Sequence, residues 1–190
     1  MRALVYYVAV TLDGFIAAPD GRADFFPWAA DVMEYCNERF PETVPTAFRG
    51  PAGLENAPNR RFGTVLMGRG TYEAGLATGA ASPYAHLRQY VVSSRLGGAA
   101  SDEVTVVGED PVAFVRRLKR ESDRDIWLCG GGRLAGTLLD EIDELVVKRY
   151  PIVLGAGVPM VEGPFGPRSF TPREARSFGN GATLTTSVAG

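Results

Sequence analysis

Short apolar runs bounded by turn residues recur along the chain, and they predict buried β-strands. Most of these runs are continuously apolar instead of alternating, which is typical of strands that are buried on both faces of a sheet. The predicted strands are Ala3–Val10, Thr64–Met67, Gln89–Ser93, Val104–Val107, Ile126–Leu128 and Leu145–Tyr150.

Helical patterns lie between these strands. The predicted helices are Trp28–Arg39, Thr71–Ala77, Pro111–Glu121 and Arg133–Leu139. The third is the best marked, because Asp110 precedes it as an N-cap residue, Pro111 takes the first helical position, and apolar residues follow at a spacing of three. Strands that alternate with helices predict an α/β sheet covered on both sides.

The end of the chain has a different pattern. Residues Glu174–Phe178 and Ala182–Val188 flank a Gly-Asn-Gly turn, which predicts an antiparallel hairpin. We therefore expect an α/β fold with a mixed, mostly parallel sheet flanked by helices and ending in this hairpin. At 190 residues the chain is most simply one domain, 1–190.

Pro41–Arg61 holds four prolines and little periodicity, so we expect a long excursion that could cover a site.

Composition excludes several classes of function. Apolar residues make up 45% and charged residues 22%, and a net charge of −2 argues against a nucleic-acid partner. The two cysteines, Cys36 and Cys129, lie far apart, and with the single histidine, His86, they form no metal-ligand pattern. No apolar run approaches the roughly 18 residues of a membrane span, and the first run is too short for a signal peptide. We expect a cytoplasmic protein.

The most informative stretch is the turn Gly68-Arg69-Gly70-Thr71, which joins a predicted strand to a predicted helix. Unpaired N–H groups at a helix N-terminus favour an anion, and two glycines allow a ligand to approach the backbone closely. Arg69 adds a charged fork that suits phosphate oxygens. The turn predicts a phosphate cradle, although many glycine turns are only turns.

A second glycine-rich turn, Gly130-Gly131-Gly132-Arg133-Leu134, also follows a strand and begins a helix. Because ligands of open α/β sheets lie at the carboxyl ends of the strands, two such turns on parallel strands would face the same crevice. The pattern is not the Gly-x-Gly-x-x-Gly fingerprint. The alternative interpretation is a tight contact between helix and strand.

A third element, Ser93-Ser94-Arg95, ends another predicted strand. Two hydroxyl groups and a guanidinium could bind a phosphate monoester such as the 2′-phosphate of NADPH. The alternative is an ordinary polar turn.

These three elements in this order resemble the dihydrofolate reductase fold from about residue 3 to 163. Two motifs bring the chain closer to the reductase domain of riboflavin biosynthesis, the RibD C-terminal domain, as a stand-alone member. They are the turn Thr11-Leu12-Asp13-Gly14 and the segment that runs from Asp143-Glu144-Leu145 to Pro151–Met160.

The resemblance implies an NADPH-dependent oxidoreductase. It implies that Arg69 and Thr71 hold the pyrophosphate, that Ser93, Ser94 and Arg95 hold the 2′-phosphate, and that Gly130 to Leu134 hold the other side of the pyrophosphate. It further implies that Ala9 and Ile16 line the nicotinamide pocket, and that the peptide bond between Gly130 and Gly131 is cis.

The proton donor is less well marked. Asp31 follows a Pro-Trp pair, as a pterin-binding carboxylate does in dihydrofolate reductases, but an acidic residue favouring the helix dipole accounts for it equally well. Lys148 stands where a threonine would support that carboxylate, and it either binds an anionic substrate or faces solvent. We expect Asp13 to be a turn residue, His86 to be exposed and Cys129 to be a small buried strand residue.

The leading specific function is reduction of the riboflavin-pathway ribosylamino pyrimidine. Dihydrofolate reduction and non-catalytic NADPH binding are the alternatives. No metal is expected. Because relatives in the riboflavin branch are often dimers, a homodimer with the terminal hairpin at its interface is a further hypothesis.

Overall fold

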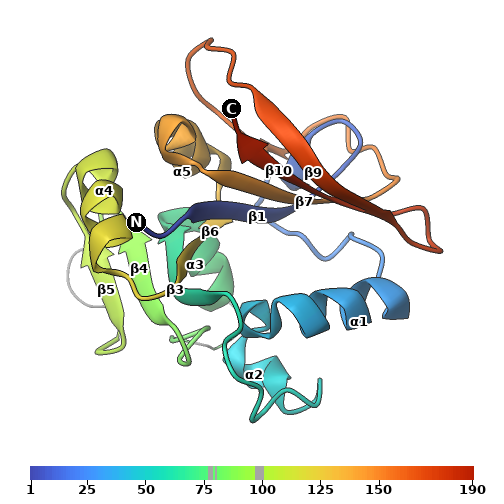
Figure 1. The fold of residues 1–190 in the computed structure, drawn as a ribbon, viewed down its shortest axis with the longest axis horizontal. Coiled ribbons are helices and arrows are strands. Elements are labelled where there is room, and N and C mark those ends of the chain that lie inside the picture. The colour runs from blue at the N-terminus through green and yellow to red at the C-terminus, as the bar shows by residue number, and fades with distance from the viewer. Residues whose placement is uncertain (77–78, 80, 97–100) are drawn as a thin grey trace.

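An eight-stranded sheet forms the centre of the computed structural model, which describes residues 1–76, 79, 81–96 and 101–190 (Figure 1). Its order is β5-β4-β3-β6-β1-β7-β10-β9. The strands are β1 (Leu4–Val10), β3 (Phe62–Gly68), β4 (Arg88–Val92), β5 (Val104–Val107), β6 (Asp125–Gly130), β7 (Glu144–Arg149), β9 (Phe170–Ser177) and β10 (Thr183–Ala189).

The first six strands of this order are parallel, whereas β10 is antiparallel to β7 and β9 is antiparallel to β10. The predicted α/β fold, its mixed sheet and its C-terminal hairpin are therefore confirmed. A second, two-stranded sheet pairs β2 (Phe15–Ala17) with β8 (Val158–Pro159). Sequence reasoning missed these two strands, because two or three residues are too few to show a period.

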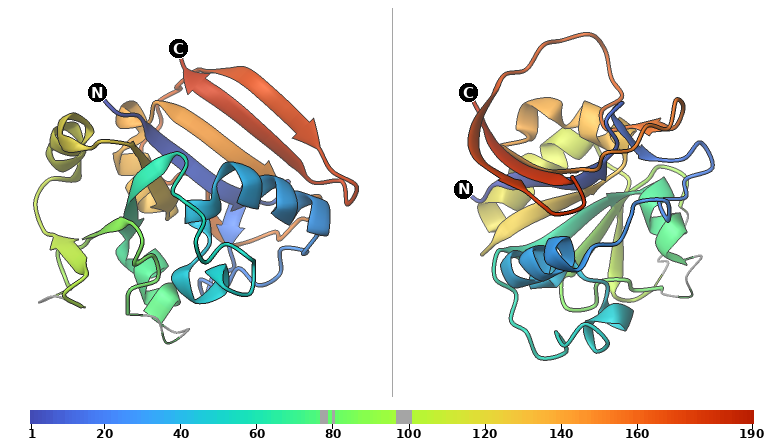
Figure 2. Two further views of the ribbon diagram at one scale, coloured as in Figure 1. Left: turned by 60° about the horizontal axis from the view of Figure 1, so that its bottom comes forward. Right: turned by 90° about the vertical axis from the view of Figure 1, so that its right-hand side faces the viewer.

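Helices cover both faces of the large sheet (Figure 2). One core contains residues of α1 (Ala30–Arg39) and α3 (Arg69–Leu76). The opposite core contains residues of α4 (Pro111–Glu121) and α5 (Gly132–Thr137). The Asp110 carboxylate accepts a hydrogen bond from the Ala113 N–H at 2.9 Å, so the predicted N-cap of α4 is confirmed. The predicted end of the second helix, Ala77, lies outside the described residues.

The excursion at 41–61 is partly helical, with a 3-10 turn η1 (Pro41–Thr43) and a short helix α2 (Thr46–Arg49); another 3-10 turn, η2 (Leu139–Glu141), follows α5. The buried Arg49 guanidinium holds the excursion together by donating to the carbonyls of Pro41 and Ala57. Of the excursion, Thr43 contributes to the cavity described below.

His86 ties this excursion to the rest of the chain, and the prediction that it is exposed is wrong. Its ring is partly buried, with Nε2 2.8 Å from the Glu42 carbonyl oxygen and Nδ1 3.2 Å from the Thr46 hydroxyl. Burial lowers the pKa of His86. The histidine satisfies polar groups of a loop, a role that no local sequence pattern indicates.

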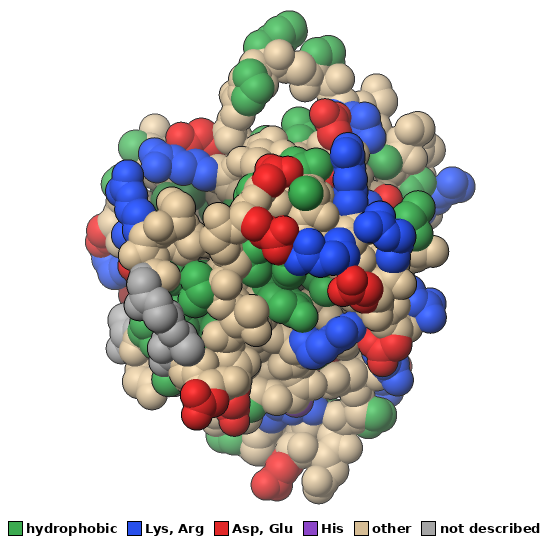
Figure 3. Space-filling model, turned by 90° about the vertical axis from the view of Figure 1, so that its left-hand side faces the viewer, with side chains coloured by type: hydrophobic (Ala, Val, Ile, Leu, Met, Phe, Trp, Pro, Cys, Tyr) green, Lys and Arg blue, Asp and Glu red, His purple; other side chains and the backbone are tan. Residues whose placement is uncertain are grey.

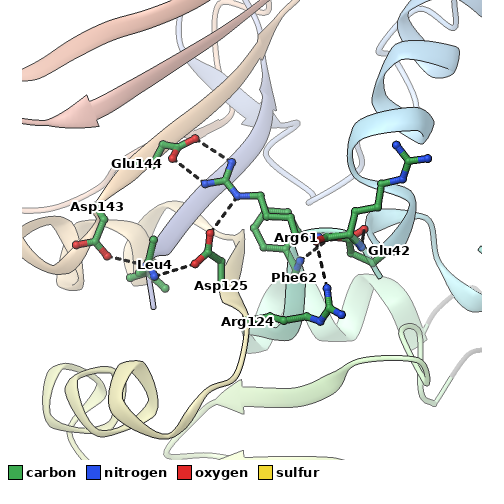
Figure 4. Close-up of polar contacts among 10 residues, drawn as sticks. Leu4, Glu42, Arg61, Phe62, Arg124, Asp125, Asp143 and Glu144 are labelled. Carbon is green, nitrogen blue, oxygen red and sulfur yellow. Dashed lines mark hydrogen bonds and ion pairs between the residues drawn. The ribbon is translucent and has the colours of Figure 1, made fainter. Parts of the chain in front are cut away.

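A polar cluster joins the starts of the four central strands (Figure 4). Arg61 makes a bidentate ion pair with Glu144 at 2.9 and 2.7 Å and also contacts Asp125 at 3.2 Å. The other Asp125 oxygen accepts from the Ala3 N–H at 3.0 Å, just before β1. Residues at the beginnings of β3, β6, β1 and β7 are thus held in one cluster.

Glu42 extends this cluster from the excursion. Its fully buried carboxylate accepts hydrogen bonds from the backbone N–H groups of Arg60, Arg61 and Phe62. Satisfying a carboxylate with several backbone donors compensates for its loss of water. The start of β3 is therefore held both by the ion pairs of Arg61 and by the hydrogen bonds to Glu42.

The surface carries mixed charges. On the side shown in Figure 3, basic and acidic side chains are interspersed instead of forming one broad patch of a single sign. Among the described residues, no helix combines the length and the apolar character needed to cross a bilayer. The same residues contain no group of three or more His, Cys, Asp or Glu side chains arranged to hold a metal ion.

We predict that Arg61→Met lowers the free energy of unfolding by about 2–4 kcal/mol, because it leaves the carboxylates of Asp125 and Glu144 without their counter-charge. Urea denaturation measures this change. Arg168→Met removes an exposed ion pair with Asp140 and is the matched control, with an expected loss below about 0.5 kcal/mol. Equal losses in the two variants would contradict a structural role for the Arg61 cluster.

Candidate functional site

A cavity of about 1500 Å³ lies at the carboxyl ends of the central strands. Ala9 of β1, Gly68 of β3, Gly130 of β6 and Lys148 of β7 contribute to its wall. The cavity is therefore at the opposite end of these strands from the Arg61 cluster. Its volume exceeds the 300–1,000 Å³ that is usual for a single drug-sized ligand.

The structure brings two of the three predicted phosphate elements together in this cavity. The predicted residues that line it are Ala9, Ile16, Gly68, Arg69, Gly70, Thr71, Gly130, Gly131, Gly132, Arg133 and Leu134. The peptide bond between Gly130 and Gly131 is cis, as the resemblance implies. Residues about 60 positions apart in the chain thus converge, as expected for turns at the ends of neighbouring parallel strands.

Several cavity glycines are not required by packing within the protein. A methyl group added at Gly70 would meet no described atom within 4 Å, and at Gly68 and Gly131 it would make only ordinary contacts of 3.6 Å or more. At these positions a side chain would project without clashing with the described parts of the protein. The absence of side chains leaves backbone surface open to a ligand, which fits the phosphate cradle of a dinucleotide.

Other glycines are explained by close packing. A methyl group at Gly132 would overlap the Pro159 carbonyl oxygen, and one at Gly136 would overlap the Glu162 carbonyl oxygen. The Glu162 N–H also donates to the Gly132 carbonyl at 2.9 Å. The interpretation of the second turn as a tight contact is therefore correct for Gly132, although its partners are β8 and the segment after it, not a strand of the large sheet.

The arginines of the cavity are paired with carboxylates. Arg69 Nη1 lies 3.6 Å from Glu73 one helical turn away, and Arg133 Nε lies 3.1 Å from Glu162. Both arginines are exposed, so these pairs are weak and leave the guanidinium groups able to bind a competing phosphate.

The third predicted element lies in a separate hollow. Ser93 and Ser94 line a space of about 700 Å³ at the ends of β4 and β5, together with Asp102. The Ser93 hydroxyl oxygen accepts from the N–H groups of Arg95 and Leu96, which is the geometry of a polar turn. Arg95 is exposed and is not among the described residues that line either space. Residues 97–100 of this region lie outside the described part of the chain.

The cavity has an aromatic lining that was not predicted. Tyr7, Phe26, Tyr84 and Trp127 all line it. The Tyr84 and Trp127 rings meet edge to face, with centroids 4.9 Å apart. One of these residues could have been predicted from the sequence. Side chains alternate between the two faces of a strand, so Tyr7, two residues before Ala9 on β1, points to the same face as Ala9.

Cys129 and Lys148 lie beside these rings. Cys129 is not the plain core residue that the sequence predicts: it is partly exposed to the cavity, and burial raises the pKa of its thiol to about 12. Lys148 Nζ lies 4.8 Å from the centroid of the Tyr7 ring. Lys148 therefore points into the cavity and not into bulk solvent.

The structure places Asp31 elsewhere. Its carboxylate accepts from the Gly179 N–H at 2.9 Å and from the Val32 N–H, so it joins α1 to the turn of the C-terminal hairpin. Asp31 is exposed and is absent from the cavity lining. This position, exposed in the first turn of α1, agrees better with the alternative account of an acidic residue that favours the helix dipole.

Asp13 does more than form a turn. It accepts from the Thr11 hydroxyl at 2.6 Å and, across the chain, from the Gly155 N–H at 2.7 Å and the Leu154 N–H at 3.1 Å. These hydrogen bonds, first that from Thr11, lower the pKa of Asp13. The carboxylate links the loop before β2 to the loop before β8, and sequence spacing alone gave no sign of that partner.

The chain is similar to several known proteins. The family model of the RibD C-terminal domain matches residues 2–184. The uncharacterized Bacillus subtilis (strain 168) protein YwjB is 32% identical over 161 residues, which cover 84% of this chain and 82% of YwjB. The uncharacterized protein YyaP of the same organism is 26% identical over 174 residues, which cover 84% of this chain and 80% of YyaP.

Two solved structures share the fold. The first, a candidate riboflavin biosynthesis protein from Shewanella sp. PV-4, has a TM-score of 0.74 and 25% identity, with 100% of this chain and 99% of that chain covered. The second is the diaminohydroxyphosphoribosylaminopyrimidine deaminase/5-amino-6-(5-phosphoribosylamino)uracil reductase from Thermotoga maritima, with a TM-score of 0.66 and 16% identity. The match covers 100% of this chain and 57% of that one.

We predict that Gly136→Ala lowers the free energy of unfolding by about 1–3 kcal/mol, because the added methyl group would displace the backbone around Glu162. Thermal or urea denaturation measures the loss. Gly166→Ala is the control, since its methyl group would meet no described atom within 4 Å and its φ is not positive. Wild-type stability in Gly136→Ala would show that the segment at 159–163 adjusts freely.

Proposed function

Because the chain belongs to the RibD C-terminal domain family, we propose that it is an NADPH-dependent reductase that transfers a hydride to a small heterocyclic substrate. One observation carries the proposal. The Gly68–Thr71 and Gly130–Leu134 turns meet in one large cavity at the carboxyl ends of parallel strands, where an α/β sheet binds its ligands.

The residues of the cavity fit a dinucleotide. The open backbone at Gly68, Gly70 and Gly131 would admit the pyrophosphate, with the Arg69 guanidinium and the Thr71 hydroxyl as donors. Ala9 and Ile16 would flank the nicotinamide ring. When bound, NADPH supplies the hydride, and the chain's own contribution is to hold and orient the reactants.

The assignment of the 2′-phosphate to Ser93, Ser94 and Arg95 is the weaker part of this arrangement. The Ser93 hydroxyl already accepts two backbone hydrogen bonds, and Asp102 lines the same hollow. The serine hydroxyls keep a proton to donate, and the exposed Arg95 guanidinium is free to turn toward a phosphate. The ratio of NADPH to NADH affinity tests this proposal.

The leading specific reaction is of the riboflavin-pathway type, reduction of a 5-amino-6-(5-phosphoribosylamino)uracil-like compound. Dihydrofolate reduction is the alternative within enzymes, but Asp31, its expected carboxylate, binds the Gly179 N–H outside the cavity. Turnover of each compound, followed as loss of NADPH absorbance, separates these reactions. NADPH binding without turnover of either would favour the non-catalytic alternative.

We predict that Arg69→Ala weakens NADPH binding by about 10- to 100-fold, because a charge-assisted hydrogen bond to phosphate contributes roughly 1.5–3 kcal/mol. Quenching of tryptophan fluorescence measures the affinity, since Trp127 lines the cavity. Arg168→Ala removes an arginine outside the cavity lining and should bind as the wild type does. If Arg69→Ala also binds normally, the Gly68–Thr71 turn is not the phosphate cradle.

We predict that the wild-type protein binds NADPH more tightly than NADH, and that Arg95→Ala removes most of this difference while leaving the NADH affinity unchanged. The reason is that only NADPH carries the 2′-phosphate that the Ser93-Ser94-Arg95 turn would bind. Titrations of both nucleotides against both proteins provide the measurement. Equal affinity of the wild type for the two nucleotides would contradict this assignment.

A further inference from the structure

Lys148 differs from the other basic residues of the cavity. The described cavity lining contains three arginines, each within 4.0 Å of a carboxylate: Arg22 beside Asp20, Arg69 beside Glu73, and Arg133 beside Glu162. For Lys148, by contrast, no carboxylate of the described residues lies within this distance of Nζ. Its closest aromatic contact is the face of the Tyr7 ring, 4.8 Å from the ring centroid. The ammonium group is therefore left without a counter-charge from the described residues.

The groups around Lys148 are thiols, a phenol and apolar side chains. Cys129 on β6 has a pKa of about 12, and burial also raises the pKa of Tyr7 on β1. Cys36 on α1 is buried and free, and the register neighbours of Lys148 on β1 and β10 are Ala9 and Leu184. Burial in these surroundings lowers the pKa of Lys148. The amine is thus closer to losing its proton than an exposed lysine is.

The choice of lysine at this position has chemical consequences. The chain contains 20 Lys and Arg residues, of which only Lys119 and Lys148 are lysines. Lys119 is held in a structural ion pair, with Nζ 2.7 Å from Asp143 and 2.6 Å from the Glu141 carbonyl oxygen. A guanidinium does not give up its proton in proteins, whereas a desolvated lysine does. Among the cavity cations, proton transfer is therefore available to Lys148.

The position of Lys148 relates it to the proposed cofactor site. Its register partner on β1 is Ala9, which would flank the nicotinamide. Tyr7, Phe26, Tyr84 and Trp127 contribute aromatic rings to the lining of this cavity, and the Tyr7 ring beside Lys148 has its centroid 6.3 Å from that of Trp127. Aromatic walls favour a planar ligand, and the ammonium group can donate a hydrogen bond to a polar atom on the rim of such a ring.

We propose that Lys148 is the catalytic proton donor, and that the substrate is a planar conjugated compound whose C=O or C=N bond is reduced with its heteroatom at Nζ. This inference rests on the proposed function. The substrate carbon receives a hydride from NADPH, which becomes NADP⁺, and the electron pair of the double bond moves to the heteroatom. The heteroatom takes a proton from Lys148, and solvent later returns a proton to the neutral amine.

The first test uses Lys148→Met and Lys148→Arg with the uracil compound named above as substrate. Lys148 is not among the residues proposed to bind the phosphates of NADPH. We therefore expect NADPH affinity in both variants to stay within about threefold of the wild type. We expect kcat to fall about 100-fold or more in both, the usual contribution of general acid catalysis. Full activity in Lys148→Arg would show that a fixed charge suffices, and full activity in Lys148→Met would overturn the proposal outright.

The proposal predicts that turnover falls as the pH rises. The donor must be protonated, so wild-type kcat/KM should fall as pH rises through the lowered pKa of Lys148. Residual activity in Lys148→Met should lack this inflection. An identical inflection in that variant would assign it to another group and contradict the proposal. Failure of the wild type to bind NADPH would instead count against the proposed function.

A second test does not depend on turnover or on a folded variant. Trinitrobenzenesulfonate, a planar aromatic anion, arylates neutral amines and releases sulfite. At pH 8 we expect Lys148 to be labelled at least about tenfold faster than Lys119, because Lys119 is locked in its ion pair. The masses of the two lysine peptides report the rates. Labelling of Lys148 at the rate of Lys119 or slower would contradict an accessible amine with a lowered pKa.

Discussion

The ion pair between Arg61 and Glu144, extended by Asp125, sets the register on which the cavity depends. It joins residues at the starts of strands that are neighbours in the order β3-β6-β1-β7. Parallel strands have no hairpin turn to fix their register, so the apolar pattern of the strands and the contacts between their starts set it. Because the strands are of similar length, alignment at one end also aligns Ala9, Gly68, Gly130 and Lys148 at the other.

The glycines show how one sequence serves both packing and a binding surface. Gly132 and Gly136 let α5 approach the carbonyl groups of Pro159 and Glu162, where a side chain would clash. Gly68 and Gly70, in contrast, have room for a side chain and lack one where the cavity wall is formed. The first pair positions the cavity wall, and the second leaves its backbone accessible.

Much of the fold and part of the site could be predicted, because the signals were local. Strand runs, the Asp110 cap and the glycine turns each occupy a few consecutive residues, and the parallel sheet then brings turns together at one edge. The partners of Arg61, Asp13 and His86 were not predictable in this way. Each of them contacts a residue distant in sequence, and any acidic residue or carbonyl group would have fitted equally well. The orientation of Lys148 likewise depends on what packs over β7.

The small sheet of β2 and β8 is reinforced by the N–H groups of Gly155 and Leu154, which donate hydrogen bonds to the Asp13 carboxylate. The small sheet joins β2, which carries Ile16, to β8, whose Pro159 packs against Gly132 of α5. Ile16 and Gly132, which both line the cavity, are thus joined through one hydrogen-bonded assembly. Parts of the cavity lining that are far apart in the chain therefore depend on the same two short strands for their positions.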